Sequence, residues 1–256
     1  MSINKEPIHV VWLKRDLRLD DNEAITNALA SNNRTLLLYA FEETLIHDPH
    51  YSERHWDFIK QSIEDINLQL QKYNTKVFAV NSEVIPCLNQ LQNYFSIDHI
   101  YSHQETGLLI TFNRDRDVNR YCKNNSIEWT ENINNGVLRG LLNREDWFEN
   151  WNRYMHDEQF NFKPRKNQFL TIEEIDHIST DFNTTDLKTS TSPWSSKKGV
   201  QQLLGSMQIL SLKKGIKNTS LIFQNQKNQE QVRVDSLPIL LGETYRSDRF
   251  FKKQHS

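Results

Sequence analysis

Hydrophobic and polar positions divide the chain into two alternating kinds of segment. Short, nearly continuous apolar runs of about four to eight residues are typical of strands buried on both faces of a parallel sheet. Such runs occupy residues 9–13, 34–41, 76–80 and 98–101, and a short final strand is expected at residues 127–129.

The segments between these runs show helical spacing. One set of apolar residues steps by three or four positions and so lies on one helical face: Ile59, Ile63, Ile66 and Leu70. The same spacing recurs over residues 84–91 and 118–122. The alternation predicts an α/β fold over residues 1–131, a Rossmann-like, doubly wound sheet of five parallel strands with flanking helices and with residues 10–12 inside the sheet.

Residues 132–194 are expected to form a helical segment followed by an interdomain linker. The aromatic-rich stretch at 137–156 has two interpretations, either an amphipathic helix that closes over the domain or a docking surface for a partner domain. From Asp176 to Ser195 the sequence is rich in Thr, Ser, Asn and Asp, which is typical of a linker.

Charge is distributed unevenly along the chain. The net charge of −2 divides into −9 for residues 1–194 and +7 for residues 195–256, and the mean hydropathy is −0.72. A composition of 37% hydrophobic and 11% aromatic residues allows most of the chain to fold. The change of charge at residue 195 therefore requires an explanation of its own.

The remaining composition favours a cytoplasmic, monomeric protein without a membrane partner. Cys87 and Cys122 lack metal-ligand spacing and are expected to be buried thiols in a reducing compartment. Lys5, Glu6 and His9 interrupt any apolar run at the start, so no signal peptide is expected. No stretch reaches the length of a membrane span.

The segment WLKRDLRLDDNEAI, residues 12–25, follows the first predicted strand. Asp21 or Asn22 is suited to cap the next helix, and a strand-to-helix turn at this edge of a parallel sheet is where open α/β sheets bind ligands. The alternative is that the charged residues only form ion pairs that fix the loop. Because neither GxGxxG nor GxxxxGK[ST] occurs, a phosphate cradle of the usual kinds is not predicted.

Three segments in order resemble the DNA photolyase/cryptochrome family, and its bacterial photolyase-like branch in particular. They are WLKRDLRLDDNEAI, SHQETGLLITFNRDRDVNRYC at 102–122 with its repeated Arg-Asp, and NNGVLRGLLNREDWFENWNRYM at 134–155. The resemblance implies an N-terminal α/β antenna domain. In some family members this domain holds a folate or deazaflavin pigment, while a separate helical domain binds FAD.

On this resemblance, a candidate antenna site comprises five residues: Lys14, Arg15, Asp16, Gln104 and Glu105. Phe112 and Asn113 stand where some folate-binding relatives carry an Asn-Glu pair. The family activity is that of a deoxyribodipyrimidine photo-lyase, a light-driven carbon–carbon lyase acting on damaged DNA. Because the helical domain is expected to be missing here, no catalytic or metal-binding residue is assigned, and the chain alone is expected to be inactive and not to bind DNA.

Residues 195–256 depart from the family pattern and are expected to be an out-of-frame, disordered tail. The written sequence lacks the family's Gly-Gly motif and its Arg-Leu-Ser-Pro-Tyr helix start. Reading the possible codons of residues 234–254 one base out of register allows RLSPYIAWGNLSIRQIFQKA, which resembles the FAD-binding domain. A one-base shift near residues 192–195, genomic or a sequencing error, explains both this recovery and the change in net charge.

Several functions remain open at this stage. The chain is part of a repair photolyase, or a fragment of a cryptochrome-like blue-light photoreceptor, or a stand-alone ligand-binding α/β domain without catalysis, or an inert product of a broken gene. Photolyase is favoured by analogy, because prokaryotic proteins with this signature often have that role.

Overall fold

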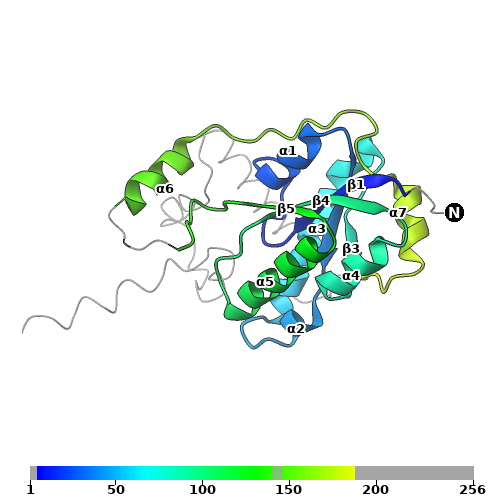
Figure 1. Cartoon of the computed structure of the whole chain (residues 1–256), viewed down its shortest axis with the longest axis horizontal. Coiled ribbons are helices and arrows are strands. Elements are labelled where there is room, and N and C mark those ends of the chain that lie inside the picture. Colours follow the sequence, from blue (N-terminus) through cyan, green and yellow to red (C-terminus); the bar gives the residue numbers. More distant parts are fainter. Residues whose placement is uncertain (1–4, 141–142, 144–145, 188–256) are drawn as a thin grey trace, which may run out of the picture.

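The computed structural model describes residues 5–140, 143 and 146–187, which form a parallel sheet with helices on both faces (Figure 1). The strands are β1 (Pro7–Leu13), β2 (Arg34–Ala40), β3 (Phe78–Val80), β4 (Ser96–His103) and β5 (Glu128–Asn132). The helices are α1 (Glu23–Ala30), α2 (Glu43–Ile46), α3 (Glu53–Leu70), α4 (Val84–Leu91), α5 (Leu109–Asn124), α6 (Trp147–His156) and α7 (Ile172–Ser179), and a 3-10 turn, η1 (Gln71–Tyr73), follows α3.

The sheet has the strand order β3-β2-β1-β4-β5 with every pairing parallel. β1 lies at its centre, where Val10 and Val11 are 0% exposed. A strand with parallel neighbours on both edges and helices over both faces has no polar side, which is why its sequence is a continuous apolar run. The predicted five-stranded parallel fold, with residues 10–12 inside the sheet, is confirmed.

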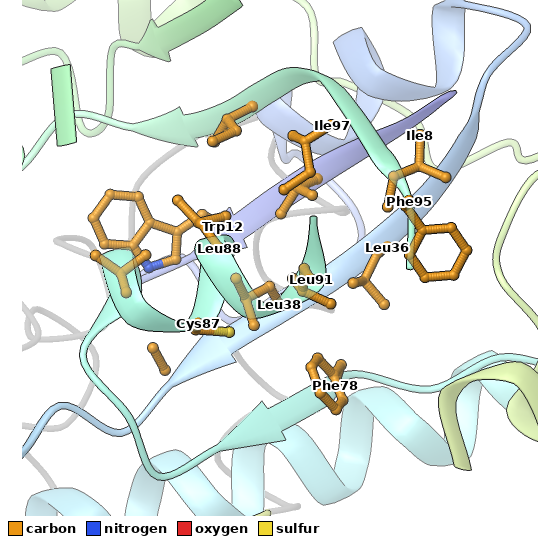
Figure 2. Close-up of a cluster of buried hydrophobic side chains, with 14 of the residues drawn as sticks. Ile8, Trp12, Leu36, Leu38, Phe78, Cys87, Leu88, Leu91, Phe95 and Ile97 are labelled. Atoms are coloured by element: carbon orange, nitrogen blue, oxygen red, sulfur yellow. The ribbon is translucent and has the colours of Figure 1, made fainter. Parts of the chain in front are cut away.

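The two faces of the sheet carry separate hydrophobic clusters. On one face, side chains of β1 and β2 pack with Cys87, Leu88 and Leu91 of α4, and Figure 2 shows these residues together with Trp12 and Phe78. α5 and α7 cover the same face. α1 and α3 cover the other face, and there the predicted positions Ile63 and Ile66 are buried.

The turn from β1 into α1 is fixed by local hydrogen bonds. Asn22 caps α1, because its side-chain oxygen accepts the Ile25 backbone N–H at 3.0 Å. Asp21 precedes it with φ of 51°, a left-handed conformation that aspartate adopts more readily than most residues. Its backbone N–H donates to the Phe160 carbonyl at 2.6 Å, so a distant segment secures the turn.

The helix expected over residues 137–156 is shorter than predicted, because α6 begins only at Trp147. Gly136 and Gly140 have φ of 66° and 74°, values that interrupt a right-handed helix. Met155 of α6 is buried, whereas Phe148 is 64% exposed. The helix therefore packs by one face and leaves an aromatic face open at the edge of the fold (Figure 1).

The linker predicted from Asp176 is wrong as far as Leu187. Ile175 and Ile178 of α7 are buried in the core, and Phe182 contacts Phe78 edge to face with ring centroids 5.0 Å apart. The Thr185 backbone N–H donates to the Ala79 carbonyl at 3.1 Å, beside β3. The apolar residues Ile175 and Ile178 lie on one face of the helix and are buried, although the surrounding sequence is polar. This stretch is therefore part of the packed fold.

The remaining predictions on chain organisation have mixed outcomes. Cys87 and Cys122 are free and buried, as expected, and burial raises the pKa of the Cys87 thiol to about 12. Among the residues that the structure describes, no helix has the length and apolarity needed to cross a bilayer. The predicted out-of-frame tail at 195–256 lies outside the described residues.

Replacement of a core leucine tests the packing of the sheet. Leu38→Ala, at a position 0% exposed on β2, is expected to lower the free energy of unfolding by about 2–5 kcal/mol through lost burial and a cavity. Leu68→Ala, at a position 55% exposed on α3, is the matched control and should change it by no more than about 0.5 kcal/mol. Urea unfolding measures both, and equal losses would contradict the assigned core.

Candidate functional site

The carboxyl ends of β1 and β4 lie side by side, because these strands are parallel neighbours. The strand order reverses direction between them, which makes this edge the usual ligand-binding position of an open α/β sheet. The loop after β1 carries Lys14, Arg15 and Asp16, and the loop after β4 carries Gln104 and Glu105. The fold thus brings all five predicted site residues to one end of the sheet.

Asp16 joins the two loops from a fully buried position. Its carboxylate accepts the Lys14 backbone N–H at 2.8 Å and lies 2.6 Å from Nδ1 of His103, the last residue of β4. The Asn22 amide donates to the same carboxylate at 3.3 Å. Burial alone would raise the pKa of Asp16, but His103, the Lys14 backbone N–H and the Arg18 charge hold it well below its usual value, so the carboxylate is ionised.

Lys14 is also buried, and its side chain contacts Asp115 of α5 and Trp12 of β1. Its Nζ lies 3.0 Å from Oδ2 of Asp115 on α5 and 4.2 Å from the ring centroid of Trp12. Burial lowers the pKa of Lys14, and the Asp115 charge opposes that shift. The ammonium is enclosed by protein groups, so it positions α5 over β1 and does not face a ligand.

Arg114 extends the network from α5 to the end of β2. It donates to Asp115 at 2.9 Å and to Glu42, which is 1% exposed and follows β2. Burial raises the pKa of Glu42, while the Arg114 charge acts in the opposite direction. The Arg114 guanidinium carbon lies 4.6 Å from the Trp12 ring centroid, so two cations contact one indole.

Arg15 lies at the rim of this network and is the most accessible of the predicted charged residues. Its side chain is 28% exposed, Nη2 donates to the Tyr51 hydroxyl at 3.3 Å, and Nε lies 3.5 Å from Glu105. A Cβ at Gly107 would meet the Arg15 guanidinium at 2.9 Å, so glycine permits this close approach. Gln104, half-buried beside it, donates its backbone N–H to the Asn132 carbonyl at 2.9 Å.

The five predicted residues therefore separate into two groups. Lys14, Asp16 and Glu105 are buried within the charged network, whereas Arg15 and Gln104 are only half-buried. The ion-pair alternative, which covered Lys14, Arg15, Asp16 and Arg18, agrees with the ion pairs that the first three of these residues form. A ligand in the loop region can contact the second group directly.

Sequence reasoning did not assign several groups that complete the site. The Arg114-Asp115 repeat was noted only as a family motif, although the buried carboxylate of Asp115 accepts from Lys14. Glu42 carries no local signal, because its partner Arg114 lies 72 positions away in the sequence. Arg139, whose Nη1 donates to Glu131 at 3.2 Å and whose Nη2 lies 3.6 Å from Asp115, was not singled out either. Among the described residues, no cluster of His, Cys, Asp and Glu has metal-binding geometry.

Removing the Asp16 charge tests the structural role of the network. Asp16→Asn is expected to lower the free energy of unfolding by about 3 kcal/mol, because His103 and the surrounding donors lose a buried anionic partner. Asp117→Asn, on the exposed side of α5, should change it by no more than about 0.5 kcal/mol. Chemical denaturation at neutral pH measures the two losses.

The Asp16→Asn variant also tests how the free energy of unfolding depends on pH. Because the folded-state pKa of Asp16 lies below its unfolded value, its stabilising contribution is complete at neutral pH and declines as pH falls below about 5. The difference in unfolding free energy between the parent chain and Asp16→Asn should therefore narrow on acidification. A difference that stays constant from pH 7 to pH 3 would contradict the assignment.

Comparison with known proteins places this geometry in a family. The family model described as DNA photolyase matches residues 9–138. Cryptochrome-2 of Gallus gallus is 31% identical over 109 residues, which are 43% of this chain and 18% of that protein. Cryptochrome DASH of Arabidopsis thaliana is 23% identical over 105 residues, 39% of this chain and 18% of that protein. The chain thus spans less than a fifth of the length of these relatives.

Two solved structures share the fold. The photolyase of Sulfolobus tokodaii aligns with a TM-score of 0.55 and 20% identity, over 73% of this chain and 43% of that one. The class III photolyase of Agrobacterium tumefaciens aligns with a TM-score of 0.57 and 14% identity, over 78% and 42%. Since the family model covers more than half of the 256 residues, and the parallel sheet agrees with it, the chain belongs to the DNA photolyase family.

Proposed function

We propose that this chain is the N-terminal light-gathering module of a light-dependent flavoprotein, and that it holds a pigment at the carboxyl ends of β1 and β4. The solved relative from Sulfolobus tokodaii is described with two FAD molecules and the implication of a novel light-harvesting cofactor. A pigment bound here would absorb light and pass the excitation to an FAD held elsewhere in the protein.

The observation that carries the proposal is that partly exposed residues follow the strand ends next to a fixed network of buried charges. Arg15 and Gln104 border the solvent, and Phe112 at the start of α5 is 44% exposed. Next to them, Lys14, Asp16 and Asp115 are held by mutual ion pairs and hydrogen bonds. A fixed network lowers the entropy lost on binding, because the groups that shape the site are already ordered.

These residues suit a planar aromatic pigment. The Arg15 guanidinium can stack on a ring or donate to a carbonyl, the Gln104 amide offers a donor and an acceptor, and Phe112 offers an apolar ring. Folate, deazaflavin and flavin pigments all present a flat ring with polar edges. The described residues contain no comparable set of contacts for the FAD of the helical domain.

In this proposal the whole light-dependent protein, and not this chain alone, repairs pyrimidine dimers or carries out blue-light signalling of the cryptochrome kind. Residues 1–194 carry a net charge of −9, which disfavours contact with DNA phosphates. The 256-residue chain supplemented with FAD should therefore leave thymine dimers unrepaired under blue light. Loss of dimers from irradiated oligonucleotides in this assay would contradict that part of the proposal.

Pigment titration tests the light-gathering role directly. Folate, deazaflavin and FMN are titrated against the purified chain, and at least one is expected to bind with a Kd below about 1 mM, corresponding to roughly −4 kcal/mol. Arg15→Ala should weaken that binding tenfold or more, since a charge-assisted hydrogen bond contributes about 1.5–3 kcal/mol. Arg120→Ala, at an exposed position on α5, is the control and should leave Kd unchanged.

A further inference from the structure

Two histidines lie side by side in the sheet, next to the last turn of α1. His9 of β1 and His99 of β4 are register partners, and their ring centroids are 5.8 Å apart. The same row continues to Thr35 on β2 and to Glu128 on β5, so four strands place polar residues at one level of the sheet. His9 is 3% exposed, whereas the other buried residues of β1 are apolar. An ionisable pair therefore interrupts an otherwise apolar strand.

His9 joins the sheet to the end of α1 and to the loop that follows it. Its Nδ1 lies 3.0 Å from the Ser31 hydroxyl and 3.4 Å from the Ala28 carbonyl, and its Nε2 lies 3.2 Å from the Asn33 amide nitrogen. The same amide nitrogen donates to the Asp98 carboxylate at 3.1 Å. Because an amide N–H group facing Nε2 needs an unprotonated nitrogen as its acceptor, this contact is made by the neutral ring.

His99 is held from the other side of the pair. Its Nδ1 lies 3.1 Å from Glu128, its Nε2 lies 2.7 Å from the Thr130 hydroxyl, and its ring stacks on Tyr101 with centroids 4.0 Å apart. Burial lowers the pKa of His99 and the neighbouring His9 acts in the same direction, while the Glu128 charge opposes them. The folded chain therefore favours the neutral ring.

The charged groups that face this pair, within the described part of the chain, compensate a proton poorly. The side chain of Asp98 is 61% exposed and that of Glu128 is 80% exposed, so water weakens both as partners. Arg165 donates to the Ser31 carbonyl and adds a positive charge on the side of α1. The last turn of α1 has no charged residue, and Thr35 of β2 offers only a buried hydroxyl without a hydrogen-bond partner.

We infer that His9 and His99 form a pH-sensitive latch: their neutral rings hold residues 28–33, the end of α1 and the loop after it, against the sheet, and protonation of the pair releases this segment. A proton on Nε2 of His9 would face the Asn33 amide N–H group, so that hydrogen bond is lost. A second charge on His99, 5.8 Å away, repels the first. Opening of residues 28–33 admits water to both rings. The latch uses no residue at the carboxyl ends of the strands, so it does not depend on the proposed function.

Amide hydrogen exchange, resolved by residue in the whole chain, tests the latch. From about pH 7.5 to about pH 5.5 the protection factors of residues 28–33, corrected for the intrinsic exchange rate, should fall about tenfold or more, while those of β3 should change less than about threefold. The double variant His9→Gln/His99→Gln has no ring to protonate at these positions, so its residues 28–33 should change less than about threefold as well. His50→Gln, at a histidine whose side chain is 65% exposed, is the matched control and should behave as the parent chain does.

A surface substitution gives a second measurement that leaves the buried pair intact. Because the Glu128 charge favours the proton on His99, Glu128→Gln should move the midpoint of the exchange transition to lower pH. Unchanged protection of residues 28–33 in the parent chain over this pH range would overturn the inference, whether or not the double variant folds. An equal fall in β3, an equal fall in the folded double variant, or a midpoint that Glu128→Gln leaves in place would overturn it too.

Discussion

The buried pair between Lys14 and Asp115 is the interaction on which the carboxyl end of the sheet depends. Their contact of 3.0 Å joins the loop after β1 to α5, and each side chain is only 4% exposed. A charge buried at that depth is tolerated only with a partner and further hydrogen bonds, so the pairing also dictates its surroundings. Arg114 and Glu42 supply a second pair, and Asp16 with His103 supplies a third.

This arrangement limits which side chains at this edge of the sheet are accessible to a ligand. Lys14 and Asp16 are taken up by internal contacts, whereas Arg15 and Phe112 at the same end of the sheet keep part of their surface exposed. The buried charges thus hold the loops in place, and in the proposed function the partly exposed groups are the ones that contact a pigment. The Trp12 ring contacts two cations, Lys14 and Arg114, and is almost fully buried, so the first residue of the family-like segment is a packing residue.

Local patterns predicted the sheet well because the strands β1, β2 and β3 are buried on both faces and most of the helices are buried on one. Asn22 was recognisable as a cap from the sequence. The contact between Arg114 and Glu42 was not, since it joins residues 72 positions apart and depends on the strand order. The second half of α7, from Asp176, was assigned to the linker from its composition, although Thr171 and Glu174 form a capping box, a T-x-x-E signal that marks the start of this helix. α6 begins at Trp147, ten residues after the start of the aromatic-rich stretch, and Gly140 within that stretch has a positive φ that a right-handed helix does not contain.

A double-mutant cycle on Lys14 and Asp115 tests the central claim most directly. Asp115→Leu should lower the free energy of unfolding by about 3 kcal/mol, since it leaves the Lys14 ammonium buried without its carboxylate. Lys14→Met should lower it by about 1–2 kcal/mol, because Asp115 keeps its hydrogen bond from Arg114. The double variant removes both charges and should lose at least about 2 kcal/mol less than the sum of the single losses. Urea unfolding gives all three values. Losses that simply add would contradict a coupled, buried ion pair at the carboxyl end of this sheet.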